Sequence, residues 1–258
     1  MERRDVQGHY ERLAAEYDEH WVYEPHHITW MSARIAETLR LSSADRIADI
    51  GCGTGMFARE VARIVNPEHA ILCVDPSVAM LRQIGTPPPA GLTPIVASAE
   101  DIAAGRSQLP YGQLDAIWLK ESVHHVADPA ATLYGLAARL APGGRLLVIM
   151  LPTSIEYPLF QAALDHFAEL QPDPALIVGH LREAGLQTHL RHVEYELRLD
   201  REKYVGMVRA RYMSMLSTFT DSEIEKGIDE MRAAHPEPVL AFPDCFAFLL
   251  GVKPEEGR

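Results

Sequence analysis

The stretch that decides the fold is Ile47-Ala48-Asp49-Ile50-Gly51-Cys52-Gly53-Thr54-Gly55. It begins inside an apolar strand, Arg46–Ile50, passes through three alternating glycines and leads directly into an amphipathic helical pattern over 57–65. Glycine is required where a backbone turns sharply, and where a ligand approaches main-chain atoms with no Cβ in between. The stretch therefore predicts a strand, a ligand-binding turn and a helix in direct succession.

The surrounding chain alternates, from about residue 45 to residue 150, between short apolar runs and amphipathic patterns. Such alternation is typical of a parallel sheet covered by helices on both faces, so the fold class is α/β. The further strands that we expect are Ile71–Val74, Ile95–Ser98, Leu114–Leu119 and Arg145–Met150. The further helices that we expect are 78–84, capped by Ser77, and one that opens at Asp128-Pro129, with a loop at Thr86–Pro94.

The chain after residue 150 follows a different pattern. Helical patterns at 157–170 and 174–184 precede Gln187–Leu199, which alternates like a half-exposed strand. A helical stretch over about 201–234 then separates that strand from the final one, Phe242–Val252. A short hairpin would satisfy the fold at this point, and long insertions in compact domains are often functional.

The first half of this inserted stretch is rich in methionine and aromatic residues, and its second half, Thr220–His235, is charged. An apolar half followed by a charged half predicts one face over a pocket and another face in solvent. We therefore expect residues 201–220, together with residues 9–30, to form a lid that excludes water and selects the acceptor. A dimer surface is the alternative.

Composition and charge exclude several classes of protein. The chain has 258 residues, 47% of them hydrophobic, with a net charge of -12 and no cluster of Lys or Arg. A surface that repels phosphate backbones makes nucleic acid a poor partner. No apolar run reaches the roughly 18 residues of a membrane span, and no secretory signal opens the chain. The three cysteines show no metal or disulfide spacing, which predicts free thiols in a reducing cytoplasm.

Two acidic residues near the glycines narrow the choice of ligand. Asp49 stands two positions before Gly51, where a carboxylate is well placed to hold an ammonium group. Asp75 ends the second strand, where an acid can accept both hydroxyls of a ribose. A dinucleotide-binding dehydrogenase would have its third glycine one position later, where this chain has Met56. Asp49, the three glycines and Asp75 together favour S-adenosylmethionine as the cofactor. A nicotinamide cofactor, bound by an oxidoreductase, is the weaker alternative.

Here the chain resembles the class I S-adenosylmethionine-dependent methyltransferases, and within them the small-molecule branch of ubiquinone/menaquinone-pathway and trans-aconitate-type enzymes. The motifs that carry the resemblance are Ile47–Gly55, Val74–Ser77, Ala97–Glu100, Leu114–Ala116, His124–Val126 and Leu140–Gly144. The resemblance implies a Rossmann-like, seven-stranded, mostly parallel sheet with an antiparallel last strand, helices on both faces and a helical lid. It also implies an N-terminal helical cap at 1–40, a cofactor-binding core at 41–150 and the remaining sheet with its insertion at 151–258.

The resemblance further implies a set of cofactor-binding residues: Tyr17, Asp49, Gly51, Gly53, Gly55, Asp75, Pro76, Ser98, Ala99, Glu100 and Lys120. Ser98-Ala99-Glu100 would lie along the adenine edge. The family often has an acid where Ser98 stands, so Glu100 or Asp101 would take over the contact to the adenine amino group. Lys120 would line the methionyl end, and Tyr17 belongs to a helix that folds over the cofactor.

The methyl group of S-adenosylmethionine leaves from a sulfonium, so the enzyme mainly has to align the acceptor. A general base is needed only when the acceptor holds its proton. His124 and His125 follow the fourth strand and are the candidate bases, unless they simply start a helix. The family motif for nucleobase or glutamine-amide nitrogen, Asn/Asp-Pro-Pro-aromatic, is missing after that strand, which argues against such acceptors.

Candidate pocket residues come from two aromatic stretches: His20, Trp21, His27, Tyr204 and Tyr212, for which ordinary packing is the alternative. No histidine pair has a third ligand at matching spacing, so no metal is expected. The sequence predicts a cytoplasmic methyltransferase that moves a methyl group to O, N, C or S of a small molecule, with a monomer and a homodimer as alternatives for its assembly. A protein that binds S-adenosylmethionine for a non-methylating reaction or for regulation is the alternative.

Overall fold

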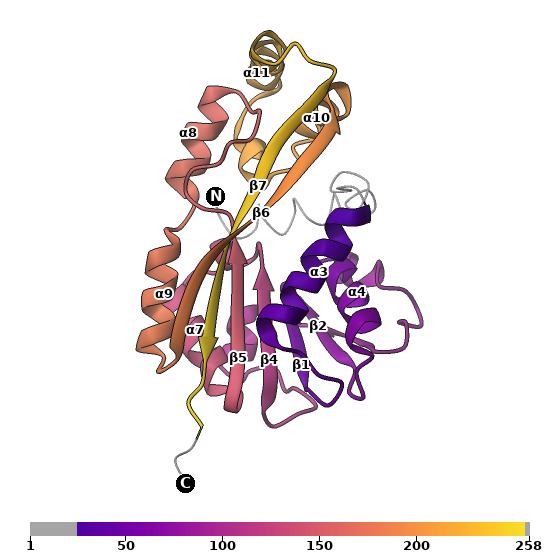
Figure 1. Cartoon of the computed structure of the whole chain (residues 1–258), viewed down its shortest axis with the longest axis vertical. Helices are drawn as coiled ribbons and strands as arrows, with labels where there is room; N and C mark the ends of the chain where they lie inside the picture. Colours follow the sequence, from indigo (N-terminus) through magenta and orange to yellow (C-terminus); the bar gives the residue numbers. More distant parts are fainter. Residues whose placement is uncertain (1–24, 256–258) are drawn as a thin grey trace.

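The computed structural model describes residues 25–255, and these residues form one seven-stranded sheet with helices on both sides (Figure 1). The strand order is β3-β2-β1-β4-β5-β7-β6. The strands are β1 (Ile47–Ile50), β2 (Ile71–Asp75), β3 (Leu92–Val96), β4 (Leu114–Lys120), β5 (Leu140–Met150), β6 (Gln187–Asp200) and β7 (Val239–Val252). Neighbours from β3 to β5 pair in parallel, and β7 is antiparallel to both β5 and β6. The expected α/β class and the antiparallel last strand are confirmed.

Two apolar layers cover the sheet. Met31 and Ile35 of α3 and Val61 of α4 belong to one buried cluster, while Leu133 of α7 and Leu181 of α9 belong to the other. The α-helices are α3 (Pro25–Leu39), α4 (Met56–Val65), α5 (Val78–Arg82), α6 (Ala99–Ala103), α7 (Pro129–Ala138), α8 (Gln161–Leu170), α9 (Pro174–Glu183), α10 (Arg201–Arg209) and α11 (Asp221–Ala234). Two 3-10 turns, η1 (Val123–His125) and η2 (Ser214–Thr218), complete the described elements.

The predicted helix caps are present. The Ser77 side chain accepts a hydrogen bond from the Met80 N–H at the start of α5, and Asp128 accepts one from the Ala131 N–H at the start of α7. Pro129 occupies the first turn of α7, where its missing N–H leaves no helical bond unmade.

Some expected boundaries are wrong, most clearly around β3. This strand spans Leu92–Val96 instead of Ile95–Ser98, so Pro94 lies inside a strand. Proline is tolerated there because β3 is the edge of the sheet and only β2 pairs with it. The sequence analysis also gave no helix for the connection between β3 and β4, where the short helix α6 lies. The loop expected at Thr86–Pro94 ends earlier, because β3 begins at Leu92.

The hairpin of β6 and β7 is longer than the sheet. Ala247–Val252 pairs with β5, whereas the part of β7 before it pairs with β6 alone. The hairpin therefore projects past the carboxyl ends of the parallel strands. It carries residues 201–238, here named the insertion, which contains α10, η2 and α11 and lies at the top of Figure 1. Helix α8 packs against η2.

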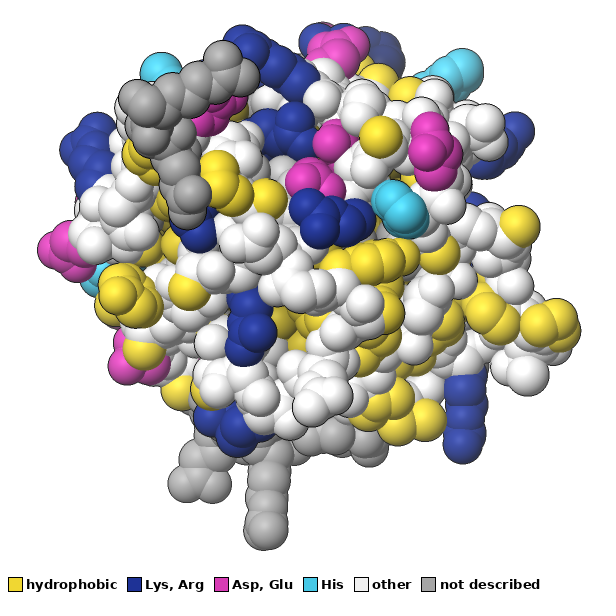
Figure 2. All heavy atoms as spheres, turned by 90° about the horizontal axis from the view of Figure 1, so that it is seen from below, with side chains coloured by type: hydrophobic (Ala, Val, Ile, Leu, Met, Phe, Trp, Pro, Cys, Tyr) yellow, Lys and Arg dark blue, Asp and Glu magenta, His cyan; other side chains and the backbone are white. Residues whose placement is uncertain are grey.

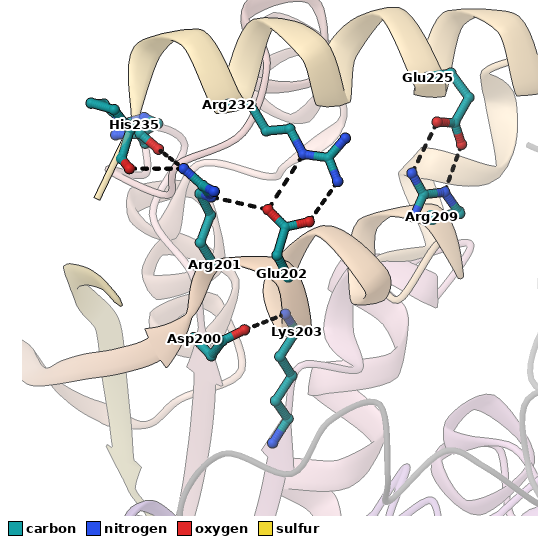
Figure 3. A network of polar contacts seen from close by, with 9 residues as sticks. Asp200, Arg201, Glu202, Lys203, Arg209, Glu225, Arg232 and His235 are labelled. Atoms are coloured by element: carbon teal, nitrogen blue, oxygen red, sulfur yellow. Dashed lines mark hydrogen bonds and ion pairs between the residues drawn. The ribbon is translucent and has the colours of Figure 1, made fainter. Parts of the chain in front are cut away.

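The helices of the insertion meet through apolar faces and an outer row of ion pairs. Val205 and Val208 of α10 and Ile224 and Ile228 of α11 are buried. Outside them, Arg209 pairs with Glu225 at 2.6 Å and Arg232 pairs with Glu202 at 2.5 Å, as Figure 3 shows. Exposed pairs of this kind contribute at most about 1 kcal/mol each, so the apolar faces hold the unit together.

The surface seen from below carries charges of both signs (Figure 2). Lys and Arg side chains are dispersed there in small groups, with acidic and apolar side chains between them. This face therefore offers no continuous basic track for a phosphate backbone. Within residues 25–255, no helix is both long enough and apolar enough to cross a membrane.

Candidate active site

The glycine turn after β1 has three residues in the left-handed region: Gly51 at φ 75°, Gly53 at φ 57° and Gly55 at φ 72°. A Cβ on Gly51 would lie 2.5 Å from the Ser122 Cβ, and one on Gly55 would lie 2.9 Å from Ile84. A Cβ on Gly53 would meet no protein atom within 4 Å. Gly51 and Gly55 are therefore required by the fold, whereas Gly53 faces open space that a ligand can occupy.

That space is a cavity of about 570 Å³ at the carboxyl ends of the parallel strands. Its volume is that of an ordinary small-molecule site, for which roughly 300–1,000 Å³ is typical. The part of the lining next to the glycine turn, here named the cofactor half after the cofactor that the sequence predicts, contains Asp49, Gly51, Gly53, Asp75, Pro76, Ser98, Ala99, Glu100 and Lys120. Another part, here named the acceptor chamber after the function proposed for it below, comes from α8 with its C-cap and from η2 with its N-cap: His166, Phe167, Leu170, Gln171, Met213, Ser214, Met215 and Thr218.

Asp75 is tied to the glycine turn. One carboxylate oxygen accepts the Gly53 N–H at 2.9 Å, and the other accepts the Ser77 N–H at 2.8 Å. Burial raises the pKa of Asp75, and these two N–H groups oppose the rise. Each oxygen keeps a lone pair for a further donor, so the carboxylate can still accept both hydroxyls of a ribose.

Asp49 is only 4% exposed, and burial raises its pKa well above the usual range. The nearby Asp75 raises it further, while the Lys120 ammonium and the Trp118 indole N–H lower it. A cationic ligand beside Asp49 would stabilise its ionised form. The cofactor half therefore fits a molecule that has an ammonium group and a ribose, and that approaches the backbone at Gly53.

Ser98 does not face an adenine with a free hydroxyl. It caps α6 by accepting the Asp101 N–H at 3.1 Å and donates to the Asp101 carboxylate at 3.0 Å. Asp101 also accepts from Arg106 at 2.8 Å, so its carboxylate is already held by residues outside the cavity. Of the two acids expected to replace the missing one, Glu100 lines the cavity and Asp101 does not.

Lys120 ends β4 and lines the cavity beside Asp49. Its ammonium lies 4.7 Å from the ring centre of Phe57 and 5.2 Å from that of Phe246. Desolvation lowers the pKa of Lys120, and the carboxylates of Glu121, Asp244 and Asp49 counteract this. The two ring faces stabilise the ammonium form of Lys120 in the wall of the site.

His124 and His125 form η1 and both line the cavity, with ring centres 4.0 Å apart. Desolvation lowers the pKa of His124 to about 4, so this imidazole is neutral at physiological pH. The Nδ1 atom of His124 is buried and has no hydrogen-bond partner among residues 25–255. A base of such low pKa removes protons poorly near pH 7, so His124 is better suited to orient an acceptor.

Glu121 is the residue that sequence reasoning missed. It follows β4 directly, lines the cavity and has φ 52°, a strained value for a residue with a side chain. Desolvation raises its pKa from 4.5 to about 7. The signal was available, because the same criterion, an acid at the carboxyl end of a parallel strand, singles out Asp75.

Three predicted pocket residues lie away from the cavity lining. Tyr204 and Tyr212 are buried in the insertion, with their hydroxyl oxygens 3.0 Å apart. His27 is fully buried, and its Nε2 lies 3.2 Å from the Asp244 carboxylate, which also accepts from the Tyr157 hydroxyl. Direct substrate contact by these three has no support in this arrangement, because the polar ends of the tyrosines face each other and His27 faces Asp244.

The remaining predicted residues, Tyr17, His20 and Trp21, lie outside the described residues. Within residues 25–255, no group of three or more His, Cys, Asp or Glu side chains is arranged to hold a metal ion. The cysteines of this part are free thiols, of which Cys73 is buried, whereas Cys52 and Cys245 are half-buried.

Comparisons with known proteins agree with this geometry. A family model described as a methyltransferase domain matches residues 48–146. A ubiquinone biosynthesis O-methyltransferase of Xanthomonas oryzae pv. oryzae is 31% identical over 174 residues, which cover 63% of this chain and 69% of that protein.

Two solved structures share the fold. A putative methyltransferase from an antibiotic biosynthesis pathway of Anabaena variabilis has a TM-score of 0.66 at 16% identity and covers 86% of this chain and 96% of its own. Phosphoethanolamine N-methyltransferase 2 of Haemonchus contortus, in complex with S-adenosyl-L-methionine, has a TM-score of 0.56 at 16% identity and covers 87% of this chain and 52% of its own.

The chain therefore belongs to the class I S-adenosylmethionine-dependent methyltransferases, and S-adenosylmethionine is its cofactor. Within that class it resembles the ubiquinone-pathway enzymes.

Proposed function

We propose that this methyltransferase methylates a hydroxyl group of a small, largely apolar molecule. The observation that carries the proposal is the continuity of one cavity from the glycine turn to the acceptor chamber. Phe167, Met213 and Met215 give that chamber an apolar wall, and each is less than a tenth exposed. The relative from Xanthomonas oryzae is by name an O-methyltransferase, which favours oxygen over the other acceptor atoms.

The cofactor half has the groups that the cofactor requires. Asp49 would hold the methionyl amine, Gly53 would allow close approach of the ligand, and Asp75 would accept the ribose hydroxyls. Glu100, with the backbone of Ala99, would line the adenine. When bound, S-adenosylmethionine supplies a methyl group on a sulfonium, which leaves with the electron pair of its bond remaining on sulfur. The protein then contributes mainly alignment, for which about 7–11 kcal/mol is the estimate for an ideally held pair.

The insertion closes the acceptor chamber in this proposal. Met213, Met215 and Thr218 of the insertion line the chamber, and Tyr204 and Tyr212 are buried in the same apolar cluster as the two methionines. Exclusion of water by this wall would keep the acceptor in line with the methyl group. The function expected of residues 201–220 is thus proposed for η2 and its N-cap, with α8 as a second wall.

Location and assembly belong to the same proposal. Free thiols at Cys52 and Cys73 favour a reducing compartment such as the cytoplasm. The net charge of -12 favours a small molecule over nucleic acid as the partner. A homodimer is the assembly to be tested, by light scattering after size-exclusion chromatography.

Transfer of a labelled methyl group tests the proposal. The purified protein would be incubated with methyl-labelled S-adenosylmethionine and a panel of apolar alcohols and phenols, with amines and thiols of similar shape as the comparison. We expect label in hydroxyl compounds, with S-adenosylhomocysteine formed in equal amount. Label found only in the amines or thiols would refute the choice of oxygen. Cofactor binding without transfer to any class would favour a non-methylating role.

A further inference from the structure

Glu121 has a strained backbone conformation at the edge of the cavity. It follows the central strand β4, at the carboxyl edge where the cavity lies, and its φ of 52° is in the left-handed region. A strained non-glycine residue of this kind persists where the surrounding structure holds it, and here the Glu121 N–H donates to the Ile149 carbonyl at 2.8 Å. Such residues concentrate at functional sites, and both Glu121 and its neighbour Lys120 line the cavity.

Hydrogen bonds place Glu121 at the boundary between the two halves of the cavity. One Glu121 carboxylate oxygen accepts the Leu151 N–H at 2.9 Å, and the Leu151 carbonyl accepts from the Gln171 side chain at 2.6 Å. Gln171 belongs to the acceptor chamber. The backbone of Leu151 therefore links Gln171 of the acceptor chamber to the carboxylate of Glu121, which is next to Lys120. The second carboxylate oxygen of Glu121 has no hydrogen-bond partner among residues 25–255.

The charges around Glu121 are mixed. Lys120 of β4 favours its ionised form, Asp244 of β7 opposes it, and desolvation opposes it most. The other titratable groups that line the cavity are Asp49, Cys52, Asp75, Glu100, His124, His125 and His166. The balance keeps the pKa of Glu121 at about 7, where a carboxylate can both take up and release a proton near neutral pH.

We propose that Glu121 is the proton acceptor for the acceptor hydroxyl, an inference that rests on the proposed function. The O–H bond of the acceptor breaks, and its proton moves to the unpartnered carboxylate oxygen of Glu121. The electron pair left on the acceptor oxygen would form the new bond to the methyl carbon, while the bond from that carbon to the cofactor sulfur breaks and its electron pair stays on sulfur. The proton leaves Glu121 for solvent once the methylated product has gone.

The proposal also balances the charge of the site. With the cofactor bound, the sulfonium cation and the Glu121 carboxylate would be neutralised together. The step would therefore create no new uncompensated charge in a low-dielectric site, where such a charge is costly. His124, neutral with a pKa of about 4, would have to become a cation in the same step and would gain stabilisation only from the acids listed above.

The first test needs no turnover. Isothermal titration calorimetry in two buffers of different ionisation enthalpy counts the protons released when a ligand binds at pH 7. The probes are sinefungin, which carries an amine where the sulfonium would be, and S-adenosylhomocysteine, which is neutral there. We expect sinefungin to release more protons than S-adenosylhomocysteine from the wild-type protein, because its cation ionises Glu121. In Glu121→Gln the two ligands should release the same number of protons. An equal difference between the two ligands in the wild type and in Glu121→Gln would overturn the proposal.

The second test measures the reaction. Glu121→Gln keeps a side-chain oxygen for the Leu151 N–H, so the variant should fold and bind S-adenosylhomocysteine within a few-fold of wild type. Its kcat should fall by roughly 10²–10⁴-fold. The rise of wild-type kcat with pH through the Glu121 titration should also disappear. Glu183→Gln, an exposed carboxylate on α9, is the matched control and should retain wild-type kinetics.

Acceptor acidity separates a base from a structural support. With 4-nitrophenol, which is ionised at pH 8, Glu121→Gln should approach the wild-type rate, whereas with 4-methylphenol it should not. Wild-type kcat and pH profile in Glu121→Gln, with a 10²–10⁴-fold loss in His124→Ala, would assign the base to His124 instead. Methyl transfer by the wild type to amines or thiols alone would refute the proposed function, and the calorimetric difference would still report on Glu121.

Discussion

The two halves of the cavity are built by different means. The cofactor half consists of strand ends and a glycine turn, and its key carboxylate, Asp75, is itself held by two backbone N–H groups. The acceptor chamber consists of side chains from α8 and η2, which lie outside the central sheet. A site formed by backbone and strand ends tolerates little change, whereas a wall of side chains on helices can vary. The comparison indicates that one half is fixed by the cofactor and the other is free to follow the acceptor.

Replacing the insertion should separate the two halves most completely. A short Gly/Ser link in place of 201–234 should leave affinity for S-adenosylhomocysteine largely intact and abolish methyl transfer, since η2 no longer closes the chamber. Calorimetry measures the affinity, and the labelled-methyl assay measures the transfer. Transfer with an unchanged KM by a shortened protein that has become monomeric would show that the insertion is an interface and not a lid.

Gly53→Val should break the cofactor half. The added side chain would enter the space that a ligand needs, and it would sit at a φ of 57° that β-branched residues avoid. We expect S-adenosylhomocysteine affinity to fall by more than about 100-fold, or at least 2.7 kcal/mol. Gly206→Ala on α10, where a Cβ also meets nothing within 4 Å, is the control and should bind normally. Equal affinity in both variants would contradict the placement of the ligand at Gly53.

Asp75→Ala should weaken cofactor binding less. The loss of hydrogen bonds to a charged acceptor is worth on the order of 1.5–3 kcal/mol, or roughly 10–150-fold in Kd. Because Asp75 also holds the Gly53 N–H, part of this loss comes from a looser glycine turn. Titration calorimetry with S-adenosylhomocysteine measures the change. Affinity within two-fold of wild type would remove Asp75 from the site.

The stability of the ligand-free protein should reveal Glu121 through its pH dependence. The pKa of Glu121 rises from 4.5 to about 7 on folding, so the folded state binds the proton more tightly than the unfolded state. Stability is therefore lost as pH rises from about 4.5 to 7, and the loss is complete above pH 7. Glu121→Gln should be more stable than wild type at pH 8, by on the order of 2 kcal/mol, and equal to it near pH 4. Urea unfolding at both pH values measures this, and a less stable variant at pH 8 would contradict it.

The smallest effect is expected at the outer ion pairs of the insertion. Arg209→Ala removes the bidentate contact to Glu225 visible in Figure 3, but both side chains are about half exposed to solvent. We expect Tm to change by less than about 2 °C, and still less in high salt. A drop of many degrees would mean that the ion pairs, and not the apolar faces of α10 and α11, hold the insertion together.

The sequence alone predicted what depends on the backbone. The strand–glycine–helix unit and the caps at Ser77 and Asp128 follow from local patterns, and the antiparallel last strand was implied by the family resemblance. The limits of β3 could not be predicted in this way, because Pro94 is acceptable in a strand only at the edge of a sheet. The edge is a property of the assembled sheet, which a local pattern does not contain.

The site divides in the same manner. Asp49, Gly53 and Asp75 line the cavity, and spacing relative to a strand end could predict where they lie. Tyr204 and Tyr212 are not among the lining residues, because helical spacing does not tell which face of a helix meets a cavity and which meets a neighbouring side chain. Glu121 was overlooked because its position after β4 drew attention to the histidines beyond it, and its raised pKa arises only from the folded surroundings.

The two ends of the insertion lie next to each other. The Arg201 N–H donates to the Pro238 carbonyl at 2.9 Å, directly beyond the point where β6 and β7 stop pairing. A segment whose ends meet can be exchanged as a cassette, since neither strand has to move to accommodate a different length or sequence. Substrate range in such an enzyme can diverge by the exchange of one piece of chain, while cofactor recognition is inherited unchanged in the sheet beneath it.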